Sequence, residues 1–281
     1  MANAYVNLTT FKGTAGLDIS GTQYDARVLQ LIENVGRELD RYAGRHFYYL
    51  VETRTFDGYG GTTLVVPDLI SIPGSGLKED TNYDGTFETV WASADILFAP
   101  SNAAPTTRWG IPYTKLLVNP RSDGTQDEFL RGVQNYEITG TWGYSRTLVD
   151  IAGDLSASID ATSTTFNLTS AGTISVGDTV VIDSEQMYVT STGTSLNLTV
   201  ERGANGSPSA THTATANVQI VVYPGPVVEA ALIQSARIWK RRESAFATQV
   251  GNPLTGQISV FVSGLDADVK AMLDSYRRFA V

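Results

Sequence analysis

The sequence contains no cysteine, and its 281 residues include only two histidines. The lack of cysteine excludes disulfide bonds, thiolate zinc sites and cysteine nucleophiles together. No apolar run approaches the roughly 20 residues that a membrane helix needs, so we expect no membrane contact. Residues 1–13 lack a basic segment followed by an apolar one, so we also expect no secretory signal.

Signatures of common catalytic sites are missing as well. There is no His-Glu-x-x-His zinc motif and no Gly-x-x-x-x-Gly-Lys-Ser/Thr phosphate loop. His46 and His212 fall in segments that we assign to different domains, and no Ser-His-Asp triad has a sequence signature, although geometry alone defines such triads. A carboxylate pair of the glycosidase type stays open, because acidic residues are numerous. We expect that the protein is not an enzyme.

The charge balance is acidic. The chain carries 29 Asp and Glu against 20 Lys and Arg, a net charge of −9. Such a charge disfavours tight binding of DNA over the whole surface. The apolar share of 42% is ordinary for a globular protein. The length predicts one or two domains.

Helical periodicity marks the two ends of the chain. Apolar residues recur at helical spacing in residues 25–42, 226–246 and 265–279. In the second of these segments Trp239 and Phe246 lie on the apolar face, and Gln234 lies opposite. Because all three helices have an apolar face, we expect the two ends of the chain to pack together. Residues 1–23 are polar with scattered aromatics, which favours an extended, flexible arm.

A basic stripe follows the polar faces of the later helices. We define it as Arg237, Lys240, Arg241, Arg277 and Arg278. Three interpretations stay open: a solvated helix surface, salt bridges to an acidic partner, or contact with DNA phosphates. The acidic total makes DNA the weakest of the three.

Between the helices the apolar period changes from helical to alternating. Residues 46–148 predict a small antiparallel sheet with turns at Asp57-Gly58 and Gly60-Gly61, and with a strand that stops at Pro67. Residues 149–222 are poor in charge and rich in Thr, Ser and Gly. The strands that we predict there are 165–168, 179–182, 187–190, 196–200 and 218–222. The expected fold class is therefore α+β: a helical domain with a small antiparallel sheet (1–148 and 223–281), interrupted by an inserted all-β domain (149–222).

One short loop has the pattern of a metal site. Oxygen-bearing side chains occur at the first, third and fifth positions of a run that continues with Gly85, as in the opening of an EF-hand calcium loop. Position twelve, where a bidentate Glu belongs, is Trp91. An ordinary Asp/Asn/Gly turn between strands is the competing interpretation. If the loop binds calcium, we expect the ligands to be Asp80, Asn82, Asp84 and Glu88. We expect no other cofactor.

Several short motifs occur in a recognisable order. They are Tyr42 to Phe47, Arg54 to Gly58, Leu64 to Pro67, the loop at Asp80, Asp95 to Asn102, Trp109 to Tyr113, Gly140 to Tyr144, and Trp239 to Ser244. In this order the chain resembles the head–tail connector proteins of tailed bacteriophages, also called adaptor or head-completion proteins. The resemblance covers about 1–148 and 223–281, which would then form the connector domain.

The resemblance implies a mechanical role in the neck of a virion. Proteins of this family form a ring, expected here to be dodecameric, beneath the portal protein of the capsid. The ring extends the channel through which DNA passes without sequence-specific binding, and it gives the tail or the next neck protein a docking surface. On this interpretation the basic stripe is a partner interface.

The inserted segment resembles small β modules of phage virion proteins. The resemblance rests on residues 180–189, on residues 198–207 and on His212, which we interpret as a structural hydrogen-bonding group in a turn. An alternative function is therefore a virion protein that binds a receptor or a carbohydrate through the β insert.

Overall fold

The structure is a computed structural model, and it divides into two compact units. It describes residues 3–14, 16–17, 19–124, 126–170, 172–193, 196–242, 249–252, 257–260 and 264–278. The first unit comprises Met1–Arg45, Val149–Ala204 and Ser209–Val281. The second comprises His46–Leu148 with Asn205–Pro208. These units group residues 149–204 with the helices. The predicted division into a connector domain and an inserted domain at 149–222 stays a prediction.

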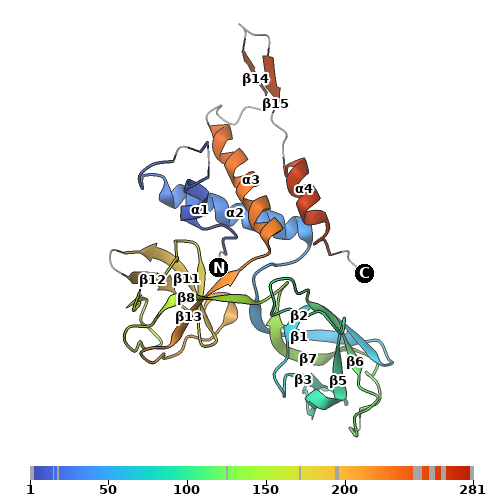
Figure 1. The fold of residues 1–281 in the computed structure, drawn as a ribbon. Coiled ribbons are helices and arrows are strands. Elements are labelled where there is room, and N and C mark those ends of the chain that lie inside the picture. Colours follow the sequence, from blue (N-terminus) through green and yellow to red (C-terminus); the bar gives the residue numbers. More distant parts are fainter. Residues whose placement is uncertain are drawn as a thin grey trace. The chain divides into compact units, whose positions relative to one another are not determined.

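The expected fold class is wrong, because the protein is mostly β. In the described part of the chain 33% is strand and 23% is helix, with two large antiparallel sheets and three substantial helices (Figure 1). The region expected to be a small sheet beside a helical domain is a seven-stranded sheet. The physical reason is that this sheet has an apolar core of its own, which includes Trp91, Trp142 and Tyr136.

The helices of the first unit come from both ends of the chain. They are α1 (Leu8–Lys12), α2 (Asp25–Ala43), α3 (Gly225–Arg241) and α4 (Ala267–Asp274). As expected, α3 packs against both α2 and α4, which Figure 1 shows beside it. Helix α2 ends at Gly44, whose φ of 68° is the left-handed conformation that glycine adopts without strain. Both α3 and α4 are shorter than predicted, and Phe246 lies outside the described residues.

Two details of the first unit differ from the predictions. Gln234 is buried rather than on the polar face of α3: its side chain accepts from Asp266 N and donates to Gly264 O, both at 3.2 Å. The N-terminal segment is not an extended arm, because it contains α1 and buries Phe11 completely. Asn7 caps α1 by accepting a hydrogen bond from Thr10 N.

The six-stranded sheet of the first unit confirms the five strands predicted in the insert. Its strands are β8 (Thr147–Asp154), β9 (Thr165–Asn167), β10 (Thr179–Ile182), β11 (Glu185–Thr192), β12 (Asn197–Glu201) and β13 (Asn217–Val222), in the order β8-β13-β10-β11-β12-β9. The sheet is joined to the helices: Tyr188 Oη donates to Glu33 Oε1 on α2 at 2.7 Å. Leu8 N donates to Val176 O at 2.9 Å.

The second unit is built around the long strand β7. Its strands are β1 (Leu50–Gly58), β2 (Thr63–Ser71), β3 (Leu77–Glu79), β4 (Thr89–Val90), β5 (Ile96–Ala99), β6 (Tyr113–Val118) and β7 (Gly132–Trp142), with a short 3₁₀ helix at Ser93–Asp95. Strand β2 does not stop at Pro67. Its register shifts between Val65 and Leu69, and Asp68 has a φ of 40°, so an irregularity accommodates the proline.

Two short elements complete the described chain. Residues Ala204–Gly206 form a 3₁₀ turn with Asn205 at a φ of 55°. Strands β14 (Gln249–Asn252) and β15 (Gln257–Val260) pair with each other in an antiparallel ribbon between α3 and α4. This ribbon overlaps the single strand predicted near residue 258.

Candidate functional site

The predicted metal loop connects β3 to β4 in the second unit. Asp80 is buried and follows directly on β3, whereas Asp84 and Glu88 are exposed. One carboxylate oxygen from each of the three lies within 4.8 Å of the others. The structure therefore brings three of the four predicted ligands into a cluster that could hold a metal ion.

Hydrogen bonds within the loop fix the direction of these carboxylates. Asp80 accepts from the backbone N–H of Tyr83 at 2.7 Å and of Gly85 at 2.8 Å. The fourth predicted ligand, Asn82, donates its amide N–H to Asp84 at 3.1 Å and to Glu88 at 2.9 Å. Its amide therefore joins two carboxylates that would otherwise repel each other.

The electrostatics of the loop favour an ionised Asp84. Hydrogen bonds from Thr86, through its side chain and its backbone N–H, lower the pKa of Asp84 and outweigh the small effect of burial. The bond from Thr86 N is 2.8 Å long. An ionised carboxylate at the surface is the form that a hard cation binds.

The base of the loop is closed by a residue pair that sequence reasoning missed. Trp91, at the position of the EF-hand glutamate, is buried and donates its indole N–H to Glu79 at 3.0 Å. Tyr136 donates its hydroxyl to the same carboxylate at 2.5 Å. The only sequence signal was the spacing of Glu79 two residues after Leu77, which places both on the same face of β3. Glu79 and Trp91 thus hold the two ends of the loop together.

The five residues of the basic stripe lie in α3 or just after α4. Arg237 forms an ion pair with Asp266, at the start of α4. Arg277 lies 3.9 Å from Asp274 and stacks over the ring of Tyr42 at 5.2 Å. Lys240 and Arg241 belong to the last turn of α3. The stripe therefore contributes to contacts inside the first unit, and its use as a partner interface stays a prediction.

The fifth residue of the stripe has a backbone role. Arg278 N donates to Ala43 O at 2.8 Å, which ties the residues after α4 to the end of α2. This bond supports the packing of the two chain ends against each other.

His212 belongs to a buried polar cluster in the six-stranded sheet. Its Nδ1 lies 2.7 Å from Asp183 and its Nε2 lies 2.9 Å from Glu185. Arg202 donates two parallel hydrogen bonds to Glu185, at 2.7 and 2.8 Å. His212 thus makes hydrogen bonds inside the sheet and forms a β-bridge with Ile159 rather than lying in a turn, and its structural role stays a prediction. We call Glu185, Arg202 and His212 the clasp.

The clasp has a strongly stabilised carboxylate. Burial raises the pKa of Glu185, but hydrogen bonds from Arg202, Ala210 N, His212 and Gly203 N together lower it to about 2. Arg202 also donates to the carbonyls of Asp160, Ser163 and Ala210. Every side chain of the clasp has a partner, so the cluster joins loops that are distant in sequence.

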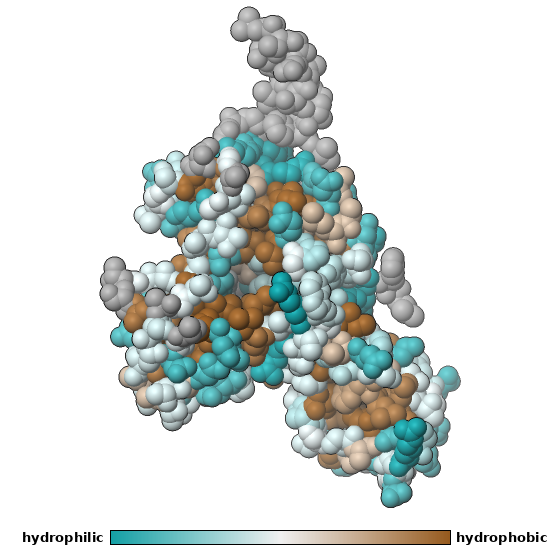
Figure 2. All heavy atoms as spheres, viewed as in Figure 1, coloured by the Kyte–Doolittle hydropathy of each residue, from teal (hydrophilic) through white to brown (hydrophobic). Residues whose placement is uncertain are grey.

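Large apolar side chains lie exposed on the second unit. Trp109 is 83% exposed, Val133 is 79% exposed and Tyr59 is 69% exposed. Figure 2 shows apolar residues on the visible faces of both sheets. Exposed apolar surface of this kind marks interaction sites in many proteins.

Comparisons with known proteins add no relative. No family model, no curated protein and no solved structure matches the chain. None of the helices in the described ranges combines the length and the apolar character that a membrane span requires.

Proposed function

We propose that the protein is a structural subunit of a bacteriophage neck, a head–tail connector whose copies form a ring beneath the portal protein. Ring copies need surfaces that recognise other copies and neighbouring proteins. The observation that carries the proposal is the exposure of three large apolar side chains on the second unit, Trp109, Val133 and Tyr59, each of which is available to a partner. The order of the sequence motifs, which resembles that of head–tail connector proteins, supports the same proposal.

The packing of the helices supports the same role. Helices α2, α3 and α4 pack against one another, and the ion pair Arg237–Asp266 joins α3 to the start of α4. The hydrogen bond between Tyr188 and Glu33 also fixes the inserted sheet to this cluster.

The experiment is to image the purified protein in negative stain and to measure its mass distribution by mass photometry as the concentration rises. A closed ring, or a monomer that adds to purified portal rings, supports the proposal. A stable monomer that ignores portal rings overturns it. If that monomer binds a glycan array, the alternative of a carbohydrate-binding virion protein takes its place.

We further propose that the loop of the second unit binds calcium as a structural ion. Three carboxylates within 4.8 Å of one another provide the hard oxygen ligands that calcium prefers. Asn82 would have to turn its amide oxygen toward the ion, because its N–H groups face Asp84 and Glu88. The ion would replace these hydrogen bonds by stronger charge interactions.

Calorimetric titration with calcium and with magnesium tests the site. We expect calcium to bind the wild type and to raise its unfolding temperature, and we expect neither effect in Asp84→Asn. Asp123→Asn, a change of equal charge elsewhere in the second unit, is the control and should bind calcium as the wild type does. Equal heats for the wild type and Asp84→Asn would exclude the site.

A further inference from the structure

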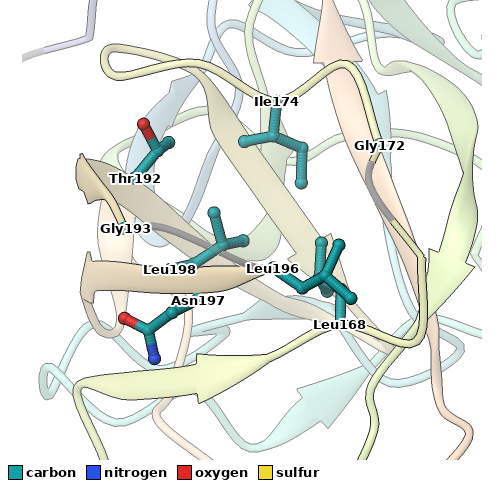
Figure 3. Close-up of a pocket in the computed structure, with 8 residues that line it drawn as sticks. All are labelled: Leu168, Gly172, Ile174, Thr192, Gly193, Leu196, Asn197 and Leu198. Carbon is teal, nitrogen blue, oxygen red and sulfur yellow. The ribbon is translucent and has the colours of Figure 1, made fainter.

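A small apolar pocket opens in the six-stranded sheet of the first unit. Its volume is about 270 Å³, and Figure 3 shows four aliphatic side chains that line it. They are Leu168, Ile174, Leu196 and Leu198. Leu168 and Leu198 are continuous with the core of the sheet, whereas Ile174 and Leu196 are only partly buried. The pocket therefore presents apolar surface that the described residues leave partly open.

The lining of the pocket includes a strained residue. Leu196 has a φ of 73°, in the left-handed region that a leucine seldom adopts. Such a conformation costs about 1–3 kcal/mol and persists where the surroundings hold it, often at binding sites. Here it belongs to a leucine whose side chain lines the pocket (Figure 3).

The volume of the pocket limits the size of a group that can fill it. Pockets for drug-sized ligands have volumes of roughly 300–1,000 Å³, so this pocket is below that range. One large side chain of a partner protein is a better match. The polar side chain of Asn197 is engaged with Asn167 at 2.9 Å, which leaves the pocket to apolar contacts.

Trp109 has the properties of such an occupant. Of the four tryptophans it is the one exposed to solvent, at 83%, and it lies in the loop between β5 and β6. The loop is held by backbone hydrogen bonds: Gly110 N donates to Thr107 O at 3.0 Å and Ile111 N donates to Ala103 O at 2.8 Å. A Cβ at Gly110 would lie 1.8 Å from Ala104 O, so the turn is closely packed. The backbone that carries Trp109 is therefore held before any contact forms, which lowers the entropy cost of binding.

The segment that carries the pocket is acidic, whereas a cation stands next to Trp109. Arg108 is exposed and lies over the Trp109 ring at 5.4 Å. Residues 149–222, which carry the pocket, contain seven Asp and Glu and one Arg, Arg202, whose guanidinium is buried against Glu185. Asp154 lies beside the pocket wall, since its backbone pairs with Thr169, next to Leu168.

We propose that Trp109 of one copy inserts into the pocket formed by Leu168, Ile174, Leu196 and Leu198 of the next copy. We call the exposed Trp109 side chain the knob. Because the knob and the pocket are different surfaces, the contact is head-to-tail. Such contacts close into rings when the rotation between copies allows it. The inference rests on the proposed ring and names the contact that builds it.

The test is a complementation experiment with two variants. Trp109→Ala removes the knob and keeps the pocket. Thr192→Arg places a long charged side chain at an exposed position of the pocket lining and keeps the knob. We expect each variant alone to be monomeric, with self-association weakened about thirtyfold or more, as for a central hot-spot residue. A mixture of the two should form one-to-one heterodimers through the single intact contact. Val65→Ala, at an exposed position of β2 outside the proposed contact, is the control and should assemble as the wild type does.

Fluorescence and circular dichroism distinguish loss of the contact from loss of folding. Trp109 emission should shift to the blue and resist acrylamide quenching as the wild type assembles, and circular dichroism should show both variants folded. If the wild type forms rings that both variants also form, this contact is wrong and the proposed function stands. If the wild type stays monomeric with Trp109 fully quenchable, and does not add to portal rings, both are wrong.

Discussion

Replacing Glu185 by Gln tests whether the clasp holds the first unit together. The substitution keeps the size of the side chain and removes its charge. The pKa of Glu185 is lowered from 4.5 to about 2, and a difference of about 2.5 units corresponds to about 3 kcal/mol. The buried guanidinium of Arg202, whose side chain is 6% exposed, would lose its anion. Breaking a buried ion pair typically costs about 3–5 kcal/mol, which agrees with this value.

The pH dependence of this cost has a definite sign. Because the pKa of Glu185 is lower in the folded protein than in the unfolded chain, its stabilisation is complete above about pH 4.5 and is lost as the pH falls toward 2. Urea unfolding should therefore show a difference of about 3 kcal/mol between wild type and Glu185→Gln at neutral pH. Near about pH 3 the difference should be about 1 kcal/mol.

Hydrogen exchange locates the effect. The amides of Gly203 and Ala210 donate to Glu185, so their protection should fall about a hundredfold in the variant. Asp183→Asn is the matched control: it touches the same histidine, but its side chain is 66% exposed, so we expect a cost below about 1 kcal/mol. Equal costs for the two variants, or a cost for Glu185→Gln that does not change with pH, would refute the reasoning.

Two further substitutions test individual hydrogen bonds. Trp91→Phe removes the indole donor to the buried Glu79 and should cost about 1–3 kcal/mol of unfolding free energy in urea titrations; a neutral result would mean that this bond does not close the loop. Tyr188→Phe removes the hydroxyl that joins the six-stranded sheet to Glu33 on α2 and should cost about 1 kcal/mol, which thermal unfolding can measure; no change in melting temperature would mean that the bond contributes nothing.

The local features of the fold were predictable from sequence. In α2 the apolar positions Val28, Ile32, Val35 and Leu39 are all buried, because a 3.6-residue period fixes one face. The strands of the insert were predictable as short runs between turn residues, and β10 is buried at every position. The cluster of Asp80, Asp84 and Glu88 was predictable because these residues are within nine positions of one another and gather by turn geometry alone.

Other features depend on contacts between distant segments, which one sequence does not reveal. Gln234 has a polar side chain, but it is buried because the residues before α4 supply partners for its amide. Pro67 suggested the end of a strand, but a shift in register accommodates it. The size of the sheet in the second unit was underestimated, because β7 pairs with β1, β2 and β3 across long sequence separations.

The clasp shows that residues which stand out in the sequence need not lie on a surface that binds a partner. Glu185, Arg202 and His212 form the most distinctive motif of the insert, yet all three side chains are buried against one another. Because their hydrogen-bonding groups are engaged inside the sheet, their role is to hold loops rather than to meet a partner. Under the proposed function, recognition would fall to residues that the fold leaves exposed. Trp109 is the largest of them, and its burial in solution is therefore the measurement that bears most directly on assembly.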